Sequence, residues 1–525
     1  VRSRRQRQMC IRDRHWTDYE IATLGASKDI YMTLQTLTQK DLLSKAVFTY
    51  SITPSSDPDF SRHQTISDKA VLNYTPNTSV LTGADEKNGI KVFIVGLCID
   101  SRAQLSREEI PSYLAKISSE KSVEKMYAVA GRFAGKYIVI VKIDNRLWMW
   151  GDASCTLAAY YATEPNSLAI AVTKPLVERQ VAPLSDAKWN ELSAGVASGQ
   201  PYPADTTGAK NIKVLLPNHL LDLQTMRAWR QPWPHKPDQN APEKIITNTF
   251  LTAQNIFKEY ARHYDLVCPL TAGYDSRTNM AIGKTVNPHL SCFTFLHDGF
   301  TANTPDLLRP QQLCAKYSLS HKVLHDEIMP VEQRNVISSL IGSDASDYVL
   351  SLAHTYQKHF GSRALINGNI IDQVGKSITG NAIPISLSTP RFLRARIYNS
   401  SKMSLQVLAK YLDAIPQPMR QYTFDLVALE NDCCRWGVQS DIAYGLAGVN
   451  MLNIFNCRDL IASWSGIPRK TRVNKAIQTG ILARVDKQLL SIPFTPESTV
   501  KRLVRMHWPL FYLASFAYAR YLRYR

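Results

Sequence analysis

From residue 265 onward, short apolar strands alternate with helical segments. The runs at 266–270, 291–296 and 321–325 have the length and composition of strands, and helical spacing fills 277–284 and 304–318 between them. A strand that returns to a parallel neighbour needs a crossover, which is usually a helix. A further strand at 364–367 and a mostly helical region over 389–490 follow. We therefore expect a parallel α/β sheet domain over 243–500.

The preceding part of the chain has a different pattern. Short β-rich runs at 92–99, 137–143, 147–150 and 168–173 are separated by turn signals, with a helical stretch near 107–118. This favours a layered domain built mainly on antiparallel strands, over 15–235. Proline and polar residues at 231–242 are typical of a linker. The expected class is therefore α+β followed by α/β.

The positive charge of the chain is concentrated at its two ends. Of the formal net charge of +18, residues 1–14 carry +5 and residues 501–525 carry +6. Residues 1–14 lack the apolar core of a secretion signal, and we interpret them as a non-native or disordered tail. In the basic aromatic tail 501–525, aromatic side chains lie between arginines. A packed terminal helix, weak contact with a membrane surface and nucleic-acid contact all remain open there. We expect no specific nucleic-acid partner.

The cysteines and the hydropathy indicate a cytoplasmic protein. The nine cysteines are scattered and form no C-x-x-C pair, which is unlike a secreted disulfide framework. No run reaches the roughly eighteen apolar residues of a membrane-spanning helix.

The turn after the strand at 266–270 has the composition of a phosphate-binding loop. It reads Thr271-Ala272-Gly273-Tyr274-Asp275-Ser276 and leads into a helix. Backbone N–H groups and the positive end of the helix dipole suit phosphate oxygens at such a turn. Asp275 would repel phosphate unless a cation lay between them. The loop therefore predicts Mg²⁺ and a nucleotide.

This loop resembles the S-G-G-x-D-S pyrophosphate loop of the asparagine synthetases and other N-type ATP pyrophosphatases. Four further segments resemble that family in the same order: Thr304–Asp306 with Ala315–Tyr317, then Asn367–Gln373, Asn453–Leu460 with Ile467–Lys470, and Asn474–Lys475. Asn367–Gln373 is similar to the family's G-x-G-x-D-E loop, whose aspartate is the second Mg²⁺ ligand. The resemblance implies ATP and Mg²⁺ as cofactors.

The family's functional residues can be carried over to matching positions. The resemblance implies that Asp275 and Asp372 bind the metal and act in catalysis with Lys475, which would stabilise the acyl-adenylate and the departing pyrophosphate. It places the nucleotide on Leu270, Thr271, Gly273, Asp275, Ser276, Phe295 and Gly368.

The first half resembles the class II glutamine amidotransferase domains, which implies an Ntn-hydrolase-like fold. The similar segments are Ala130–Phe133, Trp150–Asp152, Tyr160–Tyr161, Leu216–His219 and Trp229. Glutamine hydrolysis in that family needs an N-terminal cysteine. Cys10 lies inside the tail of residues 1–14, so we predict that this domain is degenerate and has no glutaminase activity.

We therefore expect an asparagine synthetase-like ATP-dependent amide ligase that forms AMP and pyrophosphate. Its partners would be a small-molecule or peptide carboxylate and an amine or ammonia, and it could be a homodimer. Asn369 and Gln373 replace carboxylates of the family pattern, so the base is open; His354, His359 and Glu430 are candidates.

Several alternatives compete with this reading. They are a non-catalytic relative, a peptide- or lactam-cyclising or polysaccharide-modifying relative, a basic nucleic-acid-binding protein and a sulfur-inserting enzyme acting on tRNA.

Overall fold

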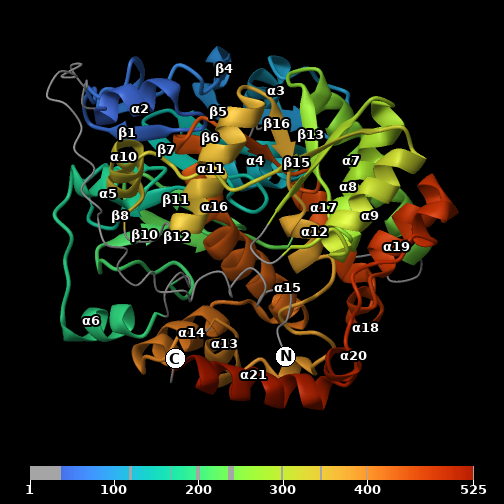
Figure 1. Cartoon of the computed structure of the whole chain (residues 1–525). Helices are drawn as coiled ribbons and strands as arrows, with labels where there is room; N and C mark the ends of the chain where they lie inside the picture. The colour runs from blue at the N-terminus through green and yellow to red at the C-terminus, as the bar shows by residue number, and fades with distance from the viewer. Residues whose placement is uncertain are drawn as a thin grey trace, which may run out of the picture.

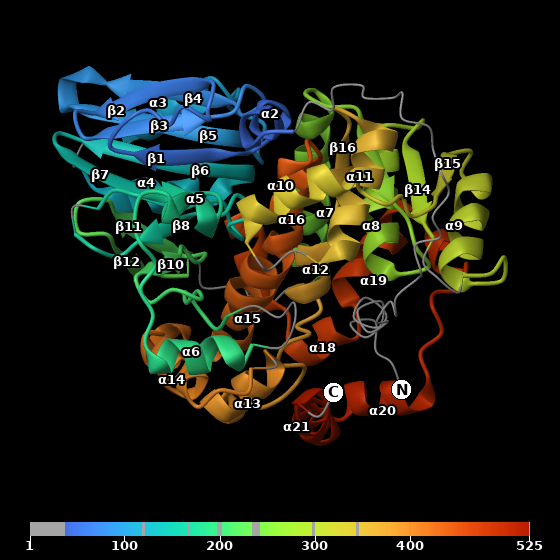
Figure 2. The same ribbon diagram turned by 60° about the vertical axis from the view of Figure 1, so that its left-hand side comes forward.

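The structure is a computed structural model of the whole chain. It describes residues 37–117, 121–165, 167–196, 202–233, 242–296, 300–342, 346–397 and 399–523. Two antiparallel sheets form the first half and a parallel sheet forms the second, and the two halves lie side by side (Figures 1 and 2).

The first half contains two six-stranded antiparallel sheets. The first has the order β10-β8-β9-β1-β3-β2, and the second has the order β12-β11-β7-β6-β5-β4. Their bounds are β1 Tyr50–Thr53, β2 Arg62–Ser67, β3 Ala70–Tyr74, β4 Val80–Asp85, β5 Ile90–Asp100, β6 Phe133–Ile143, β7 Arg146–Gly151, β8 Tyr160–Ala162, β9 Ile170–Ala171, β10 Ile212–Val214, β11 His219–Asp222 and β12 Arg227–Arg230.

Side-chain alternation along β5 explains why the two sheets stack. Phe93, Val95 and Leu97 face the large core shared with the first sheet, whereas Val92 and Ile94 face a separate core. Successive side chains of a strand point to opposite faces, so an apolar strand with both faces buried needs a layer on each side. Helices α3 (Glu109–Ile117) and α4 (Val123–Val129) supply the outer layer over this separate core.

Further short helices of this half lie around the sheets. They are α2 Gln39–Lys45, α5 Lys174–Glu178 and α6 Ala187–Ala194, with 3₁₀ turns at Glu86–Asn88 and Ala130–Arg132.

The second half is built on a five-stranded parallel sheet with the order β15-β14-β13-β16-β17. The chain enters at the central strand β13 (Leu266–Pro269), builds outward to β14 (Ser291–Phe295) and β15 (Ser320–Leu324), and then crosses to β16 (Ala364–Ile366) and β17 (Asn450–Leu452). The strands β13, β16 and β17 are almost entirely buried, without alternation. Continuous burial is typical of a parallel sheet covered on both faces.

The second half also contains most of the helices of the chain. They are α7 Pro242–Ala261, α8 Tyr274–Val286, α9 Pro305–Lys316, α10 Val331–Ile341, α11 Asp347–Phe360, α12 Asn369–Gln373, α13 Pro390–Arg396, α14 Met403–Asp413, α15 Thr423–Val427, α16 Val438–Leu446, α17 Arg458–Ser463, α18 Arg469–Val473, α19 Ala476–Val485, α20 Thr499–Met506 and α21 Trp508–Arg523. A π-helix, η6, spans Ala428–Gly437, and 3₁₀ turns lie at Ile385–Leu387, Gln417–Tyr422, Trp464–Gly466 and Lys487–Leu490.

A polar network joins the two halves at the loop after β17. The side-chain amide of Asn456 donates to Asp152 Oδ1 at 2.8 Å and to the carbonyl oxygen of Gly135 at 2.5 Å, and its Oδ1 accepts from Ser154 Oγ at 2.8 Å. A β-bridge between Ala134 and Cys457 continues this contact. One hydrophobic core also runs through both halves. The halves therefore fold against each other rather than being connected by a linker alone.

The structure confirms the expected sequence of a mainly antiparallel region and a parallel α/β region. The predicted strand at 168–173 is only the two residues of β9, and β17 lies within the region expected to be mostly helical. The expected linker at 231–242 lies mainly outside the described residues, as do residues 1–14. The eight cysteines described are buried and form no disulfide. Among the described helices, each is too short or too polar to cross a bilayer.

Candidate functional site

The candidate site lies where the chain stops adding strands on one side of the parallel sheet and starts on the other. Strands β13 and β16 are neighbours, but the chain leaves β13 toward β14 and leaves β16 toward β17. The crevice beyond the carboxyl ends of two such strands is the usual ligand position of an open parallel sheet. The loops that follow these two strands are 270–276 and 367–372, which contain most of the residues singled out from the sequence.

The first loop is held in shape by its own hydroxyl groups. Ser276 Oγ accepts from the backbone N–H of Thr271 at 3.1 Å and lies 2.9 Å from Thr271 Oγ1, which in turn accepts from Gly273 N at 3.1 Å. The thirteen-residue helix α8 begins at Tyr274, and its N-cap is Gly273, which offers no side chain to the first turn. The first N–H groups of a helix are attractive to anions. The hydrogen bonds of the loop therefore fix the position of the N-terminal turn of α8.

Asp306 connects this loop to two other segments. Its Oδ1 accepts from Ala272 N at 3.0 Å and from Thr495 Oγ1 at 3.2 Å, and Thr495 N donates to the carbonyl oxygen of Ala272 at 3.2 Å. Asp306 belongs to the first turn of α9, in the segment that resembles the family. Here it fixes the loop through the backbone.

The second loop is anchored directly on the first. Asn279 Nδ2, from α8, donates to the carbonyl oxygen of Asn367 at 3.0 Å, and Asn453 Nδ2 donates to Asn367 Oδ1 at 2.6 Å. Gly368 lies so close to α8 that a methyl group added there would sit 3.2 Å from the Cβ of Asp275. The close approach of the two loops therefore depends on glycine at this position.

The two aspartates predicted to share a cation do meet around one positive charge. That charge is the ammonium group of Lys376, which lies in the turn after α12. Its Nζ donates to Asp275 Oδ2 and, at 2.7 Å, to Asp372 Oδ1. The remaining oxygens accept from amides: Asp275 Oδ1 from Gln478 Nε2 at 3.1 Å, and Asp372 Oδ2 from Gln373 Nε2 at 3.1 Å. Each of the four carboxylate oxygens thus accepts a hydrogen bond from an N–H donor.

This arrangement does not fit a divalent cation. Mg²⁺ requires about six oxygen ligands near 2.1 Å, whereas here an ammonium and two amide donors occupy both carboxylates. Within the described part of the chain, no group of three or more His, Cys, Asp or Glu side chains is arranged to hold a metal ion. No chemical step is therefore derived through a metal.

Lys475 lies beside the first loop in an unusual conformation. Its φ is +67°, in the left-handed region, and it precedes α19 as the N-cap. The ammonium nitrogen lies 4.4 Å from the ring centroid of Tyr274. Tyr274 is stacked on Phe494 with centroids 3.7 Å apart, and the Arg277 guanidinium lies 3.8 Å from the centroid of Phe494. The structure thus brings Lys475 to the loop that contains Asp275.

Leu270 and Phe295, two of the residues on which the resemblance places the nucleotide, pack into the domain. The Leu270 side chain is fully buried, its carbonyl oxygen accepts from Thr294 Oγ1 at 2.9 Å, and its backbone N–H donates to the carbonyl oxygen of Phe293 at 2.7 Å. Phe295 is partly buried and makes edge contacts with Tyr348 and Tyr356, at 6.5 and 6.3 Å between centroids.

Two candidate bases are engaged in other contacts. His359 Nε2 lies 2.8 Å from Glu327 Oε1, and Lys322 Nζ lies 2.9 Å from His359 Nδ1. Glu430 is fully buried and is held by both Nη atoms of Arg230 and by Tyr411 Oη at 2.7 Å. His354 is partly buried on α11.

The π-helix η6 contacts both the site and the first half. It packs on α12, and Gly437 faces the Asn369 amide, while Arg435 Nη2 donates to the carbonyl oxygen of Thr206 at 2.7 Å. Asp432 accepts a hydrogen bond from Thr379 Oγ1. Trp436 is partly exposed rather than a core residue. π-helices are rare and are often found at functional sites.

Residues of the amidotransferase-like segments have structural partners. Arg132 forms a buried ion pair with Asp100. Asp152 accepts from the backbone of Tyr137, Ser154, Thr156 and Leu157 as well as from Asn456. Burial raises the pKa of the Asp152 carboxyl, against the lowering effect of these donors. Cys10 lies outside the described residues.

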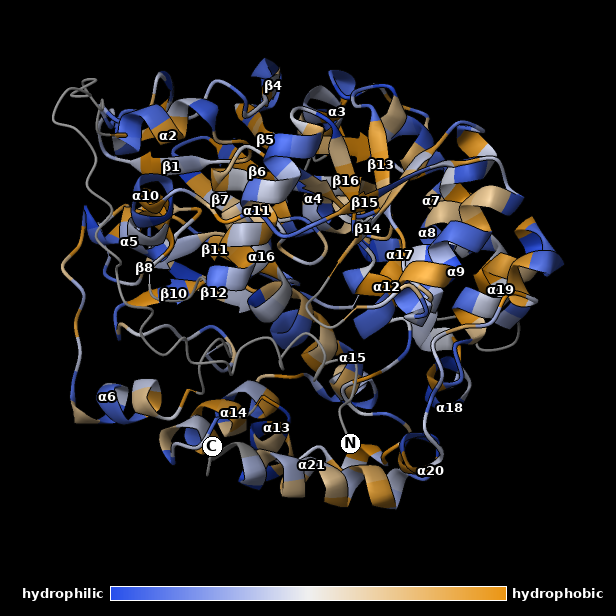
Figure 3. Ribbon diagram, viewed as in Figure 1, coloured by the Kyte–Doolittle hydropathy of each residue, from blue (hydrophilic) through white to orange (hydrophobic). Residues whose placement is uncertain are grey.

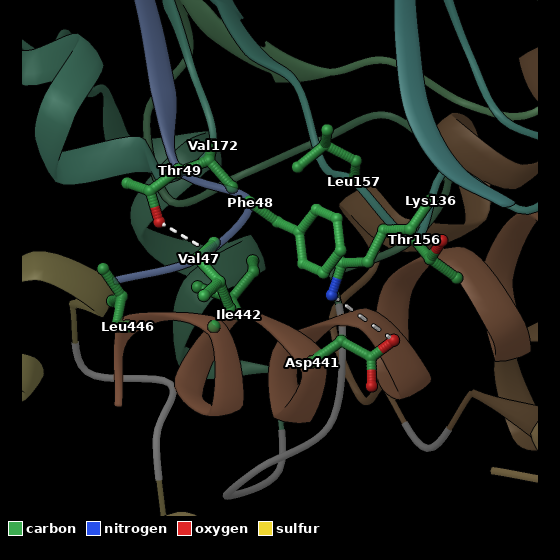
Figure 4. Close-up of a pocket in the computed structure, with 11 residues that line it drawn as sticks. Val47, Phe48, Thr49, Lys136, Thr156, Leu157, Val172, Asp441, Ile442 and Leu446 are labelled. Atoms are coloured by element: carbon green, nitrogen blue, oxygen red, sulfur yellow. Dashed lines mark hydrogen bonds and ion pairs between the residues drawn. The ribbon is translucent and has the colours of Figure 1, made fainter. Parts of the chain in front are cut away.

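A small hollow at the junction of the two halves encloses a buried ion pair (Figure 4). Lys136 of β6 lies 4.0 Å from Asp441 of α16, with Phe48 beside it, and both side chains are about 5% exposed or less. The hollow measures about 10 Å³, which holds one water molecule at most. Burial lowers the pKa of Lys136 and raises that of Asp441 to about 6. This site is too small for a substrate.

Sequence reasoning missed Lys376 and Gln478. Lys376 follows Asp372 by four residues, a spacing at which side chains of a helical turn are neighbours, so the pairing with Asp372 had a signal in the sequence. Gln478 had none, because it meets Asp275 across more than two hundred residues.

Comparisons with known proteins add no assignment. The chain matches no protein-family model and, at a significant level, no curated protein sequence.

Proposed function

We propose that this chain is an asparagine synthetase-like, ATP-dependent amide ligase that forms AMP and pyrophosphate and lacks glutaminase activity. The observation that carries this proposal is the convergence of Asp275 and Asp372 on one cation beyond the carboxyl ends of β13 and β16. Two acidic loops at the switch point of a parallel sheet, beside the N-terminus of α8, form a binding position for a nucleotide.

In the proposed reaction, the oxygen of a substrate carboxylate attacks the α-phosphorus of ATP, and the bond to the β-phosphate oxygen breaks to release pyrophosphate. A neutral amine or ammonia then attacks the acyl carbon, loses a proton and expels AMP. Thr271, Gly273 and Ser276 would orient the phosphates. Lys475 would oppose the negative charge that develops on the departing groups.

The fold assignments implied by the resemblance belong to the same proposal. The order β15-β14-β13-β16-β17 supports an ATP-pyrophosphatase-like domain, and the α/β/β layering of the first half supports a degenerate amidotransferase-like domain. In this proposal the first half is retained because it supports the loop after β17, which contacts the site through Asn453 and Asn367.

Pyrophosphate release tests the proposal. The full chain is incubated with ATP and pools of amino acids, sugar acids and peptides, with and without ammonia, and ATP–pyrophosphate exchange is measured. We expect exchange with at least one pool and a loss of at least about a hundredfold in Asp275→Asn, which removes a group at the reacting phosphates. The exposed Asp347→Asn is the matched control. Exchange that is unchanged in Asp275→Asn would refute the proposal.

A second candidate is a non-catalytic relative, and a specific observation favours it. Phe494 stacks on Tyr274 and Thr495 is bonded to Ala272, so the segment that follows Leu490 covers the outer side of the first loop. In addition, Asn369 and Gln373 provide amides where relatives have proton acceptors. Absence of exchange with every pool, combined with ATP binding that Asp275→Asn does not alter, would favour this candidate.

A further inference from the structure

We infer that Lys376 takes the place of the divalent cation, so that Asp275 and Asp372 are a carboxylate pair neutralised by the protein itself. This inference deepens the proposed function. Its first test uses metal alone and does not depend on that function.

The first argument is the position of the ammonium group. Lys376 Nζ contacts one oxygen of each carboxylate, which is the bridging position that a shared metal ion would take. The Lys376 and Asp275 side chains are only 9% and 12% exposed. A second positive ion placed between the same oxygens would meet the ammonium at close range with little water to screen the repulsion.

The second argument is the polarity of the neighbouring amides. Gln373 and Gln478 present N–H groups to the outer oxygens of Asp372 and Asp275. An N–H donor satisfies a carboxylate but cannot bind a metal, whereas the family pattern has a carboxylate at the position of Gln373. Lys376 and Gln373 thus agree with each other: both supply donors where a metal site needs acceptors.

The third argument concerns what remains when the ammonium is removed. The two carboxylates would then face each other without the ammonium group between them. The fully buried Gln478 also has a carbonyl oxygen for which no partner exists among the described residues. Two carboxylates at one gap are an acceptable start for a hard cation that keeps several waters. Removal of the Lys376 ammonium should therefore create a cation site that the native chain lacks.

The experiment measures Mn²⁺ binding by electron paramagnetic resonance in the absence of nucleotide. It compares the native chain, Asp372→Asn, Lys376→Met and the double variant Lys376→Met/Asp372→Asn, with the exposed Lys69→Met as a matched control. We expect the native chain, Asp372→Asn and Lys69→Met to give the same titration. Lys376→Met should bind one additional Mn²⁺ per chain, and the double variant should lose it.

Two results would overturn the inference. One is a Mn²⁺ site in the native chain that Asp372→Asn abolishes. The other is a folded Lys376→Met that gains no site. If Lys376→Met does not fold, the comparison of the native chain with Asp372→Asn still decides the question.

A nucleotide arm separates this inference from the proposed function. ATP binding to the native chain is measured in Mg²⁺ and in excess chelator. Equal affinities in the two conditions support the inference, and at least about tenfold weaker binding in chelator that Asp372→Asn no longer shows would oppose it. Absence of ATP binding in both conditions counts against the proposed function and leaves the Mn²⁺ result intact.

A second, independent observation concerns the C-terminal helices α20 and α21. Of the ten large apolar side chains that are exposed in the described chain, six lie on these two helices: Val500, Leu503, Met506, Leu510, Leu513 and Tyr521. The first five, from Val500 to Leu513, recur at intervals of three or four residues, which is the period of one helix face, and Tyr521 follows eight residues later. A soluble surface rarely gathers exposed apolar residues in this way without a partner.

The other face of α21 packs against the domain, mainly on α13. Tyr512 stacks on Phe392 of α13 with centroids 5.0 Å apart, and Ser515 and Ala519 are buried. The helix is thus held against the domain (Figures 1 and 3), as expected for a packed terminal helix, with its apolar outer face turned away from the domain.

The charge of this surface points to an anionic phospholipid bilayer as the partner. Residues 498–523 contain five lysines and arginines and no acidic residue. Beside Met506 lies an open hollow of about 570 Å³ that is also lined by Arg469, Lys470 and His507. An apolar stripe beside basic groups matches an interfacial helix that inserts into acyl chains while cations contact lipid phosphates.

Vesicle sedimentation of the full chain tests this second inference. We expect binding to vesicles of phosphatidylcholine and phosphatidylglycerol in equal parts, weaker binding to phosphatidylcholine alone, and a decrease with salt. Leu503→Glu/Leu513→Glu should weaken binding by about tenfold or more, because it removes two apolar side chains from the stripe and adds two negative charges. Leu251→Glu is the control, because Leu251 is 48% exposed on α7.

Three results would overturn it. They are no binding to the anionic vesicles, equal loss in Leu251→Glu, or a dimer of the native chain that Leu503→Glu/Leu513→Glu converts to a monomer. The last would show that a second copy covers the stripe.

Discussion

Arg472→Met tests the buried ion pair between Arg472 and Asp425, which lies next to the segments that contain Lys376 and Lys475. Arg472 of α18 contacts Asp425 of α15 through two parallel hydrogen bonds of 3.0 and 2.8 Å, and it also donates to the carbonyl oxygens of Val374 and Ile467 at 3.0 Å each. Val374 lies two residues before Lys376, and Arg472 lies three residues before Lys475. This single side chain therefore connects both lysines of the site to α15.

The magnitude follows from burial. The two side chains are 1% and 5% exposed. Removal of one partner of a buried pair leaves an uncompensated charge and costs about 3–5 kcal/mol. If the second half unfolds as a unit of about 250 residues, that free energy corresponds to a decrease in Tm of roughly 6–20 °C. Replacement of both partners, in Arg472→Met/Asp425→Leu, should recover more than half of the loss, because no buried charge remains.

The assay is thermal unfolding, supported by the midpoint of urea unfolding. Arg484→Met is the matched control: its partner Glu243 is 78% exposed, so the change should stay below about 1 kcal/mol. If Arg472→Met lowers stability no more than Arg484→Met, or if the double variant is less stable than Arg472→Met, the desolvated pair does not stabilise the fold as argued.

Three further predictions follow from single contacts. Burial raises the pKa of Asp441 to about 6 from an ordinary 3.8. The protonated carboxyl therefore contributes stability that is fully present below about pH 4 and is lost as the pH rises through 6. Asp441→Asn should remove this pH dependence, which is worth about 3 kcal/mol, and unfolding measured from pH 4 to 7 checks it. Gly368→Ala should push the two loops apart and slow ATP–pyrophosphate exchange by about tenfold. Gly437→Ala is the control, because its added methyl would have its nearest neighbours at 3.8 Å. Equal exchange rates in the two variants would contradict the close approach of the loop at Gly368 to α8. Asn456→Ala should lower the free energy of unfolding by about 1–3 kcal/mol because it removes the side-chain hydrogen bonds to the buried Asp152 carboxylate and the Gly135 carbonyl oxygen. The exposed Asn77→Ala is the control, and a loss no larger than its own would count against the junction.

The local patterns that predict the parallel sheet are the ones the structure bears out. The strand at 266–270, the helix after it and the strands at 291–296 and 321–325 each appear within a few residues of their expected bounds. They were predictable because each apolar run has the length of a strand, a helical pattern lies between the runs, and glycine, proline or aspartate turns separate them. The three-residue β17 shows no period and is a strand only because β16 pairs with it.

The approach of the two aspartates was predictable from the sequence, but the positive charge between them was not. Two aspartates after two strands are enough to predict that their carboxylates approach each other. The cation between them could not be read from the same motif, because Lys376 lies outside it and Gln478 arrives from a distant segment. The placement of Leu270 is a similar case: its side chain belongs to the core, and a motif does not show which way a residue at a strand end points.

The junction between the halves gives a physical reason why the first half supports the second. Asp152 holds the loop 154–157 and Asn456, and the Asn456 loop continues to Asn453, which bonds Asn367 at the start of the second site loop. Removal of the first half would expose Asn456, Cys457 and the apolar core that both halves share. The hydrogen bonds of Asp152 thus help to position a loop that leads to the second site loop and Asp372. Two of the segments in which the first half resembles the amidotransferase domains, Ala130–Phe133 and Trp150–Asp152, lie at this contact with the second half.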